Sequence, residues 1–229
     1  IEYYASKPAL NIEGLGEKNV ETLVDNGLIS SLPDIYTITT EQLSQLDRFA
    51  EISANKLVDN IQASKNPPLA KFITAIGIRH IGAQTAIDLA SHFKDFDALR
   101  NATEAELLEL PGIGKTVAES ILAFFSDEDN LAMLDALEKN GVKPQFIDTS
   151  NGKLHGLSFV VTGTLDSMGR DIAAEKIRAE GGEFHSSVVK TTTYLVAGRN
   201  TGKSKLEKAA KYGTKVIDEA EFLNLLGES

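Results

Sequence analysis

Glycines paired around an apolar residue, each pair with a lysine close behind, form the clearest chemical pattern in this sequence of 229 residues. One pair lies in residues 110–116 (LPGIGKT) and another in residues 12–18 (IEGLGEK). Glycine permits a positive φ and leaves the adjacent backbone amides uncovered. Consecutive amides at a helix N-terminus form a cradle for one phosphate group. The two segments are therefore candidate phosphate-binding turns, and a plain turn between two helices is the alternative.

Composition and spacing exclude several other kinds of site. The chain contains no cysteine, which excludes disulfides, zinc–thiolate sites and thiol nucleophiles. The Gly-Lys pairs at 114–115 and 202–203 resemble a P-loop, but that loop needs glycine where this chain has Glu109 and Ala197. The histidines do not have the spacing of metal ligands; they are His80, His92, His155 and His185.

The net charge of −10 is unevenly distributed along the chain. Residues 1–150 hold 12 Lys and Arg against 23 Asp and Glu, whereas residues 151–229 hold 11 against 10. A broad positive field is therefore absent, so any binding of nucleic acid must depend on local phosphate-binding geometry. No apolar run reaches the ~18–20 residues that a membrane-spanning helix needs.

The glycine pattern repeats four times along the first part of the chain. The second glycine position falls at residues 16, 50, 82 and 114, at steps of 34, 32 and 32 residues. Each copy predicts a helix, a tight hairpin and a second helix. The middle apolar residue of each hairpin is expected to plug into the helix pair; these residues are Leu15, Phe49, Ile81 and Ile113.

The sequence also predicts where these elements begin and where the first part ends. Thr39 and Thr103 each stand three residues before Gln or Glu, as in a capping box at a helix start. Residues 66–68 (NPP) mark a break between the second and third repeats. Residues 145–153 have no helical period and form the candidate linker to a second domain.

The pattern after the linker alternates strands with helices. Residues 159–162, 194–197 and 215–217 are short apolar strands, and helices are predicted at 170–180, at 204–212 and after Asp218. Alternating strands and helices indicate a small parallel sheet with helices on its faces.

The repeats resemble tandem helix-hairpin-helix DNA-binding motifs, and the second part resembles a BRCT domain. In place of the tryptophan that many BRCT domains carry in the last helix, Phe222 is expected to fill the space. The order of the motifs is similar to that of the C-terminal part of bacterial NAD-dependent DNA ligases, over essentially all 229 residues. The BRCT likeness rests on Thr162-Gly163, Arg170, Gly181-Gly182, residues 193–198 (TYLVAG) and residues 203–209 (KSKLEKA).

This resemblance implies an all-α tandem helix-hairpin-helix domain with four repeats over residues 1–149. A small α/β BRCT domain with a parallel four-stranded sheet would follow over residues 150–229. The fragment would bind the backbone of nicked double-stranded DNA around the nick without reading its sequence. The parent enzyme would join 3′-hydroxyl and 5′-phosphate ends in replication and repair.

The parent ligase would use NAD, magnesium and zinc, which its adenylation, OB and zinc-finger domains hold. Since none of these domains is recognised in this chain, we expect the fragment to bind no cofactor and to be non-catalytic alone. We expect a monomer in the bacterial cytoplasm, associated with the nucleoid. Its partners would be DNA and the other ligase domains, and not a membrane.

The predicted DNA-backbone residues lie in the four hairpins. They are Gly14, Leu15, Gly16 and Lys18 in the first, Arg48 in the second, Arg79, His80 and Gly82 in the third, and Gly112, Ile113, Gly114, Lys115 and Thr116 in the fourth. Arg48 and Ala50 stand where glycines would give the tightest hairpin, and His80 replaces the first glycine of the third repeat.

A second candidate site would hold one phosphate in the BRCT part, from a DNA 5′-end or a phosphorylated side chain. Thr162 and Gly163 close the first strand, where a parallel sheet opens its ligand crevice. Arg170 and Lys205 each begin a helix, beside its positive end. The four positions match the phosphate pocket of phosphate-binding BRCT domains, including that of the replication factor C large subunit. The alternative is a threonine that caps its strand and two solvated basic side chains.

Two other functions fit the same motifs. One is a protein-interaction adaptor, in which the BRCT part binds a partner and the repeats act as a rigid spacer. The other is a different repair or clamp-loading protein that combines these two modules.

Overall fold

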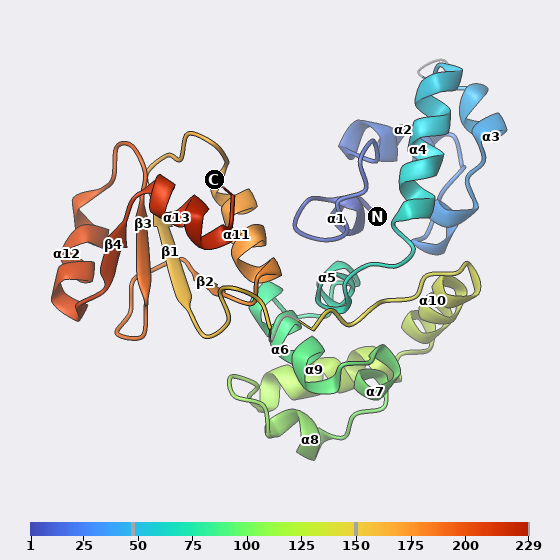
Figure 1. The fold of residues 1–229 in the computed structure, drawn as a ribbon. Coiled ribbons are helices and arrows are strands. Elements are labelled where there is room, and N and C mark those ends of the chain that lie inside the picture. Colours follow the sequence, from blue (N-terminus) through green and yellow to red (C-terminus); the bar gives the residue numbers. More distant parts are fainter. Residues whose placement is uncertain (47–48, 149–150, 229) are drawn as a thin grey trace. The chain divides into compact units, whose positions relative to one another are not determined.

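The structure of the chain is a computed structural model that describes residues 1–46, 49–148 and 151–228 (Figure 1). It divides into two compact units, Ile1–Ile147 and Asp148–Ser229. None of the helices in these described ranges is long and apolar enough to cross a membrane.

The regular elements that the structure describes in residues 1–46 and 49–147 of unit 1 are all helices, as the repeat pattern predicts. Its elements are α1 (Glu2–Ala5), α2 (Glu17–Asp25), the 3₁₀-helix η1 (Pro33–Thr37), α3 (Thr40–Ser44), α4 (Glu51–Ala63), α5 (Leu69–Ala75), α6 (Ala83–Phe93), α7 (Phe96–Arg100), α8 (Glu104–Leu108), α9 (Lys115–Ser126) and α10 (Glu128–Lys139). Both predicted capping boxes are confirmed: Thr39 caps α3 with Gln42, and Thr103 caps α8 with Glu106. The longer helices α2, α4, α6 and α9 each follow one of the four hairpin segments.

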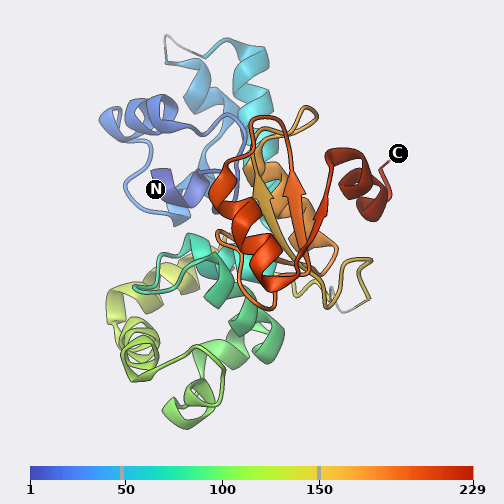
Figure 2. The same ribbon diagram turned by 90° about the vertical axis from the view of Figure 1, so that its left-hand side faces the viewer.

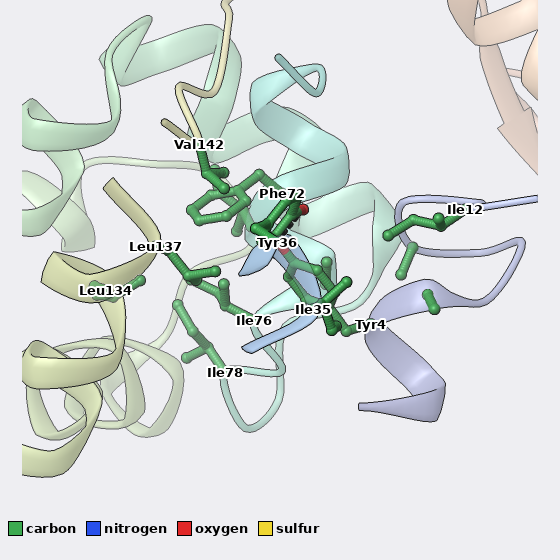
Figure 3. Packing of buried hydrophobic residues seen from close by; sticks show 14 of the residues in the cluster. Tyr4, Ile12, Ile35, Tyr36, Phe72, Ile76, Ile78, Leu134, Leu137 and Val142 are labelled. Carbon is green, nitrogen blue, oxygen red and sulfur yellow. Dashed lines mark hydrogen bonds between the residues drawn. The ribbon is translucent and has the colours of Figure 1, made fainter. Parts of the chain in front are cut away.

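Apolar side chains from α1, η1, α5 and α10 meet in one core within unit 1 (Figure 3). At its centre the hydroxyls of Tyr4 and Tyr36 are 2.9 Å apart and hydrogen-bonded, and their rings meet edge to face. Tyr4 is 1% exposed, and burial raises the pKa of its hydroxyl. The Tyr36 hydroxyl also accepts a hydrogen bond from Ser64 in a segment after α4, at 3.4 Å.

A short strand-like pairing joins the middle of unit 1 to its last residues. The amide of Lys143 donates to the Lys65 carbonyl at 2.7 Å, and the amide of Gln145 donates to the Pro67 carbonyl at 2.8 Å. The amide of Leu69 in turn donates to the Gln145 carbonyl at 2.7 Å. The predicted break at residues 66–68 is therefore a connection between repeats that the tail of the unit holds in place.

Unit 2 is a four-stranded parallel sheet with helices on both faces, which confirms the predicted α/β fold class. The strand order is β2-β1-β3-β4. The elements are β1 (Ser158–Thr162), α11 (Arg170–Ala179), β2 (Glu183–His185), β3 (Tyr194–Ala197), α12 (Lys203–Tyr212), β4 (Lys215–Ile217) and α13 (Glu219–Leu226).

The side chains of unit 2 alternate between two apolar layers, because successive strand residues point to opposite faces. Phe159 and Val161 pack with α11 and α13, whereas Val160 packs with Leu195 and with α12. Figure 2, seen from the α12 side, shows this helix crossing in front of the strands. Phe222 of α13 is fully buried, with its ring centroid 6.1 Å from that of Phe159.

We expect Tyr36→Phe to destabilise unit 1 by about 1–3 kcal/mol, because it leaves the buried Tyr4 hydroxyl without its partner. Tyr4→Phe should cost less, since Ser64 still reaches the Tyr36 hydroxyl. The double variant should be more stable than Tyr36→Phe alone. Urea unfolding followed by far-UV circular dichroism measures all three. If the loss of unfolding free energy in the double variant equals the sum of the two single losses, the two hydroxyls do not depend on each other.

Candidate nucleic-acid interface

The four hairpins of unit 1 share one backbone turn. In each, the amide of the middle apolar residue donates to the carbonyl three residues earlier, at 3.0 or 3.1 Å. The pairs are Leu15 to Ile12, Phe49 to Leu46, Ile81 to Ile78 and Ile113 to Leu110. Leu15, Phe49 and Ile113 are buried, and Ile81 is half-buried against the same core. Their burial agrees with the predicted role of these residues as plugs between the helices.

The position before the plug has a left-handed backbone in the first, third and fourth repeats. Gly14 has φ +88°, Gly112 has φ +86°, and His80 adopts φ +68° although it carries a side chain. Arg48, the equivalent residue of the second repeat, lies outside the described residues. The positive φ expected from both glycines of a pair is therefore found only at the first.

The second glycine position is instead the N-cap of the following helix, in extended backbone. Gly16, Gly82 and Gly114 have φ between −82° and −95° with ψ near 175°. Ala50 takes almost the same conformation, with φ −69° and ψ 153°. A Cβ built at any of these three glycines would meet no other atom within 4 Å. Glycine is thus not required there by conformation, and its effect is to leave space in front of the helix end.

The helices that follow the hairpins begin without a side-chain cap. No side chain accepts a hydrogen bond from the first turn of α2, α4, α6 or α9 at its N-cap residue. By contrast, Thr39, Thr103 and Asp127 cap α3, α8 and α10 with their side-chain oxygens. The first amides of a helix need acceptors and carry the positive end of its dipole. The hairpin ends therefore offer their amides to an anionic group.

The side chains around these ends differ between repeats. Lys18, Arg79, His80, Lys115 and Thr116 are all exposed, and the ammonium group of Lys115 lies 3.8 Å from the Glu119 carboxylate. The second repeat instead places Glu51 and Ile52 in the first turn of α4, and Ile52 is 85% exposed. Since α2 also begins with an acidic residue, Glu17, the difference lies in Ile52, an exposed apolar side chain where α2 carries Lys18. This makes the second hairpin end less suited to a phosphate than the first.

The first hairpin is also braced by residues that the sequence analysis did not single out. Asn19 donates to the Gly14 carbonyl at 2.7 Å, and Asn60 donates to the Glu13 carbonyl at 2.9 Å. Lys56 forms an ion pair with Glu13 at 2.9 Å, and its hydrogen bond and charge lower the pKa of that carboxyl. Asn60 and Lys56 come from the next repeat, so no local pattern could reveal these contacts.

The BRCT candidates gather around a cavity of about 480 Å³ in unit 2. It is lined by Val161, Gly163, Arg170 and the loop between Gly163 and Arg170. The ammonium group of Lys205 donates to the Val161 carbonyl at 3.3 Å, which places Lys205 beside this cavity. Thr162 is buried within the sheet, and its carbonyl accepts the amide of Gly198. The structure thus brings three of the four candidates to the cavity.

Two cations near this cavity lack a negative partner. Arg170 lies over the Phe184 ring, with 5.6 Å from its guanidinium carbon to the ring centroid. In the described ranges, neither Arg170 nor Lys205 forms an ion pair with a carboxylate. Burial and the charge of Arg170 lower the pKa of Lys205. A bound anion would relieve this repulsion, so the arrangement favours a negatively charged ligand.

Close backbone contact explains two glycines of the BRCT pattern. A Cβ built at Gly198 would lie 2.3 Å from the Thr164 carbonyl oxygen, and one at Gly163 would lie 2.4 Å from that of Arg199. These glycines allow the segments after β1 and β3 to pair, with Thr164 and Arg199 exchanging two hydrogen bonds of 2.8 Å. They therefore shape the wall of the cavity.

Comparison with known families matches most of the chain. Residues 6–63 match the SAM-like helix-hairpin-helix tandem, and residues 71–134 match the helix-hairpin-helix motif. Residues 149–226 match the BRCA1 C-terminus (BRCT) domain. A crystal structure of Rad4 BRCT1,2 in complex with a Crb2 phosphopeptide is similar at 18% identity and a TM-score of 0.31, over 48% of this chain and 57% of that one.

Curated relatives match this chain from end to end. Proteins named DNA ligase from Cytophaga hutchinsonii and Halorubrum lacusprofundi are 40% and 42% identical over 99% and 100% of this chain. A DNA ligase from Dehalococcoides mccartyi is 41% identical over 100% of it. The chain is homologous to a C-terminal region of DNA ligases. It spans about a third of the length of these relatives, 34%, 32% and 34% respectively. The predicted resemblance to the C-terminal part of DNA ligases is thereby confirmed.

The two glycines of the fourth hairpin should respond differently to substitution by alanine. Gly112→Ala should destabilise unit 1 by about 1–2 kcal/mol, because alanine is strained at φ +86°. Gly114→Ala should cost less than about 1 kcal/mol, since its backbone is extended and the space beside it is open. Chemical unfolding of both variants makes the comparison. Equal losses would show that the positive φ is not a constraint on this hairpin.

Proposed function

We propose that the chain is the DNA-engaging part of an NAD-dependent DNA ligase, and that it holds duplex DNA by its backbone around a nick. The observation that carries this proposal is the shared geometry of the hairpins, whose helices begin without side-chain caps. The homology to DNA ligases supports the same activity for the whole protein. A chain of this kind would act in replication and repair, within the cytoplasm.

The hairpin geometry suits phosphate groups and not base edges. The backbone amides at one helix end together bind one phosphate group. Contacts to phosphates carry no direct sequence information. Residues 1–150 are strongly acidic, with 23 Asp and Glu against 12 Lys and Arg. Binding should therefore depend on a few short contacts at the first, third and fourth hairpins and only weakly on long-range attraction.

We further propose that the cavity of unit 2 holds one phosphate group, through Gly163, Arg170 and Lys205. The observation that favours it is the pair of cations at this cavity, neither of which forms an ion pair with a carboxylate in the part of the chain that the structure describes. A 5′-phosphate at a DNA end is the ligand most consistent with a ligase. Thr162 would contribute through its place at the end of β1 more than through an exposed hydroxyl, because it is 8% exposed.

NAD, magnesium and zinc would act in other parts of the ligase. The chain contains no cysteine, so a zinc site of four thiolates does not fit its residues. We propose that these groups bind outside the present chain, that it acts as a monomer, and that its partners are nicked duplex and the remaining ligase domains. The adaptor function is less favoured, since the homology extends over the repeats as well as the BRCT domain.

Binding of the chain to nicked duplex should fall only gently with salt. The slope of log affinity against log salt should be on the order of −2 to −4, at roughly −0.9 for each neutralised phosphate. Titration of a fluorescent nicked duplex at several salt concentrations measures it. A slope several times steeper would indicate a charged surface in place of the hairpin contacts.

The same assay separates the amides from the lysine of the fourth hairpin. Gly114→Val should weaken binding about tenfold, because the methyl groups of valine would cover the amides. The backbone at position 114 is extended and suits valine, so the fold should be kept. Lys115→Ala should have a smaller effect, about two- to fivefold, since an exposed charge is screened. Ala50→Val, at the matched position of the second repeat, is the control. Unchanged affinity of Gly114→Val would exclude this hairpin as a DNA contact.

The cavity of unit 2 should prefer a duplex that carries a 5′-phosphate. Arg170→Ala or Lys205→Ala should weaken this preference by roughly 10–150-fold, the range for one charge-assisted contact. Lys208→Ala, on the exposed side of the same helix as Lys205, is the matched control. Competition between the phosphorylated duplex and its unphosphorylated twin gives the ratio. Equal affinity for the two duplexes in the unmodified chain would leave the cavity without a DNA-phosphate role.

A further inference from the structure

The wall of the unit 2 cavity is a loop held by a residue far away in the sequence. Residues 164–169 join β1 to α11 and line the cavity next to Arg170. Glu219, the first residue of α13, receives three hydrogen bonds from this loop. One oxygen accepts the amide of Asp166 at 2.7 Å, and the other accepts the amide of Ser167 at 2.7 Å and its hydroxyl at 2.5 Å.

A second segment fixes the other end of the same loop. Thr164 exchanges two backbone hydrogen bonds with Arg199, each of 2.8 Å. The Arg199 guanidinium also pairs with the Asp166 carboxylate at 2.8 Å. The loop is therefore clamped between the segment after β3 and the start of α13, and Arg170 follows it directly in the chain.

We infer that Glu219 is the positioning residue of the anion site: its carboxylate holds the loop in the shape that places Arg170 at the cavity. This inference rests on the phosphate-binding function proposed above for the cavity. Glu219 would not touch the bound phosphate, since its oxygens are already engaged by Asp166 and Ser167. Its contribution would be to fix the cavity wall before the ligand arrives, which reduces the ordering cost of binding.

The charges around Glu219 favour its ionised form at neutral pH. Burial alone would raise the pKa of its carboxyl, but the hydrogen bonds from Ser167 and Asp166 and the charge of Arg199 lower it below the usual 4.5. Asp166, which is paired with Arg199, faces it from the loop, and Asp218 and Glu221 lie beside it on its own helix. Because the folded-state pKa is depressed, the clamp is complete above about pH 4.5 and is lost as the pH falls through that lowered value.

The test uses the full chain with Glu219→Gln, which keeps the shape and removes the charge. Glu221→Gln is the matched control, because it makes the same charge change in the same helical turn without touching the loop. Two quantities are measured. The first is the affinity ratio for a 5′-phosphorylated duplex over its unphosphorylated twin. The second is the hydrogen-exchange protection of the Asp166 and Ser167 amides by NMR at neutral pH, without DNA.

The expected result is a ratio about tenfold lower in Glu219→Gln and unchanged in Glu221→Gln, the loss that one charge-assisted contact gives at the low end of its range. The Asp166 and Ser167 amides should be protected from exchange in the unmodified chain and in Glu221→Gln, and less protected in Glu219→Gln, because their acceptor has changed. If Glu219→Gln keeps the full preference, or if the two amides keep their protection in it, the inference is wrong while the anion site stands.

Two further outcomes are distinguished by the same measurements. If the unmodified chain shows no preference for the phosphorylated duplex, the proposed anion site fails, and the positioning role fails with it even where the two amides are protected from exchange. If Glu219→Gln does not fold, Ser167→Ala decides, because it removes one of the three hydrogen bonds. A reduced preference in Ser167→Ala supports the inference, and a full preference overturns it.

Discussion

The buried apolar residue at the centre of each hairpin is the contact on which the geometry of unit 1 depends. Its amide closes a turn with the residue three positions earlier, and its side chain enters the core between two helices. The next residue is the N-cap of the following helix. The first residues of α2, α6 and α9 are exposed, and these helix starts have no side-chain cap. The buried residue thus fixes the position of the uncapped helix end that would meet a phosphate.

This constraint explains how so acidic a domain can belong to a DNA-binding protein. Partial charges at a helix end act over a few ångströms, whereas a net charge acts over a Debye length of about 10 Å. Under the proposed function, the hairpins would bind phosphates at short range, while the acidic surface around them would add no long-range attraction. The second repeat keeps the turn and the plug, Phe49, but presents Glu51 and Ile52 in its first turn. Its geometry preserves the packing of the repeats even where its chemistry is less suited to phosphate.

Unit 2 uses a different constraint to build its cavity. The backbone after β1 passes so close to the backbone after β3 that only glycine fits at Gly163 and Gly198. This crossing fixes the start of the loop that lines the cavity, and Glu219 fixes its middle. The cavity wall is therefore defined by contacts among β1, β3 and α13, while the two cations come from the starts of α11 and α12. A single change in α13 can thus alter a site that none of its residues lines.

The sequence by itself determined the hairpins and most of the longer elements, because they follow from local rules, whereas the short strand β2 (Glu183–His185) was not predicted from its residues. The period of the glycine–apolar pattern located the four hairpins, the Thr39 and Thr103 capping boxes marked helix starts, and short apolar runs marked β1, β3 and β4. Only the tertiary structure decided which backbone conformation each glycine adopts and that His80 takes a positive φ. It also decided that Asn60 braces the first hairpin and that Glu219 braces the loop of the unit 2 cavity. Local patterns depend on neighbours within about four residues, for which the chain itself fixes the geometry. The bracing contacts join residues 47 to 53 positions apart, and their partners become neighbours only when the core has formed.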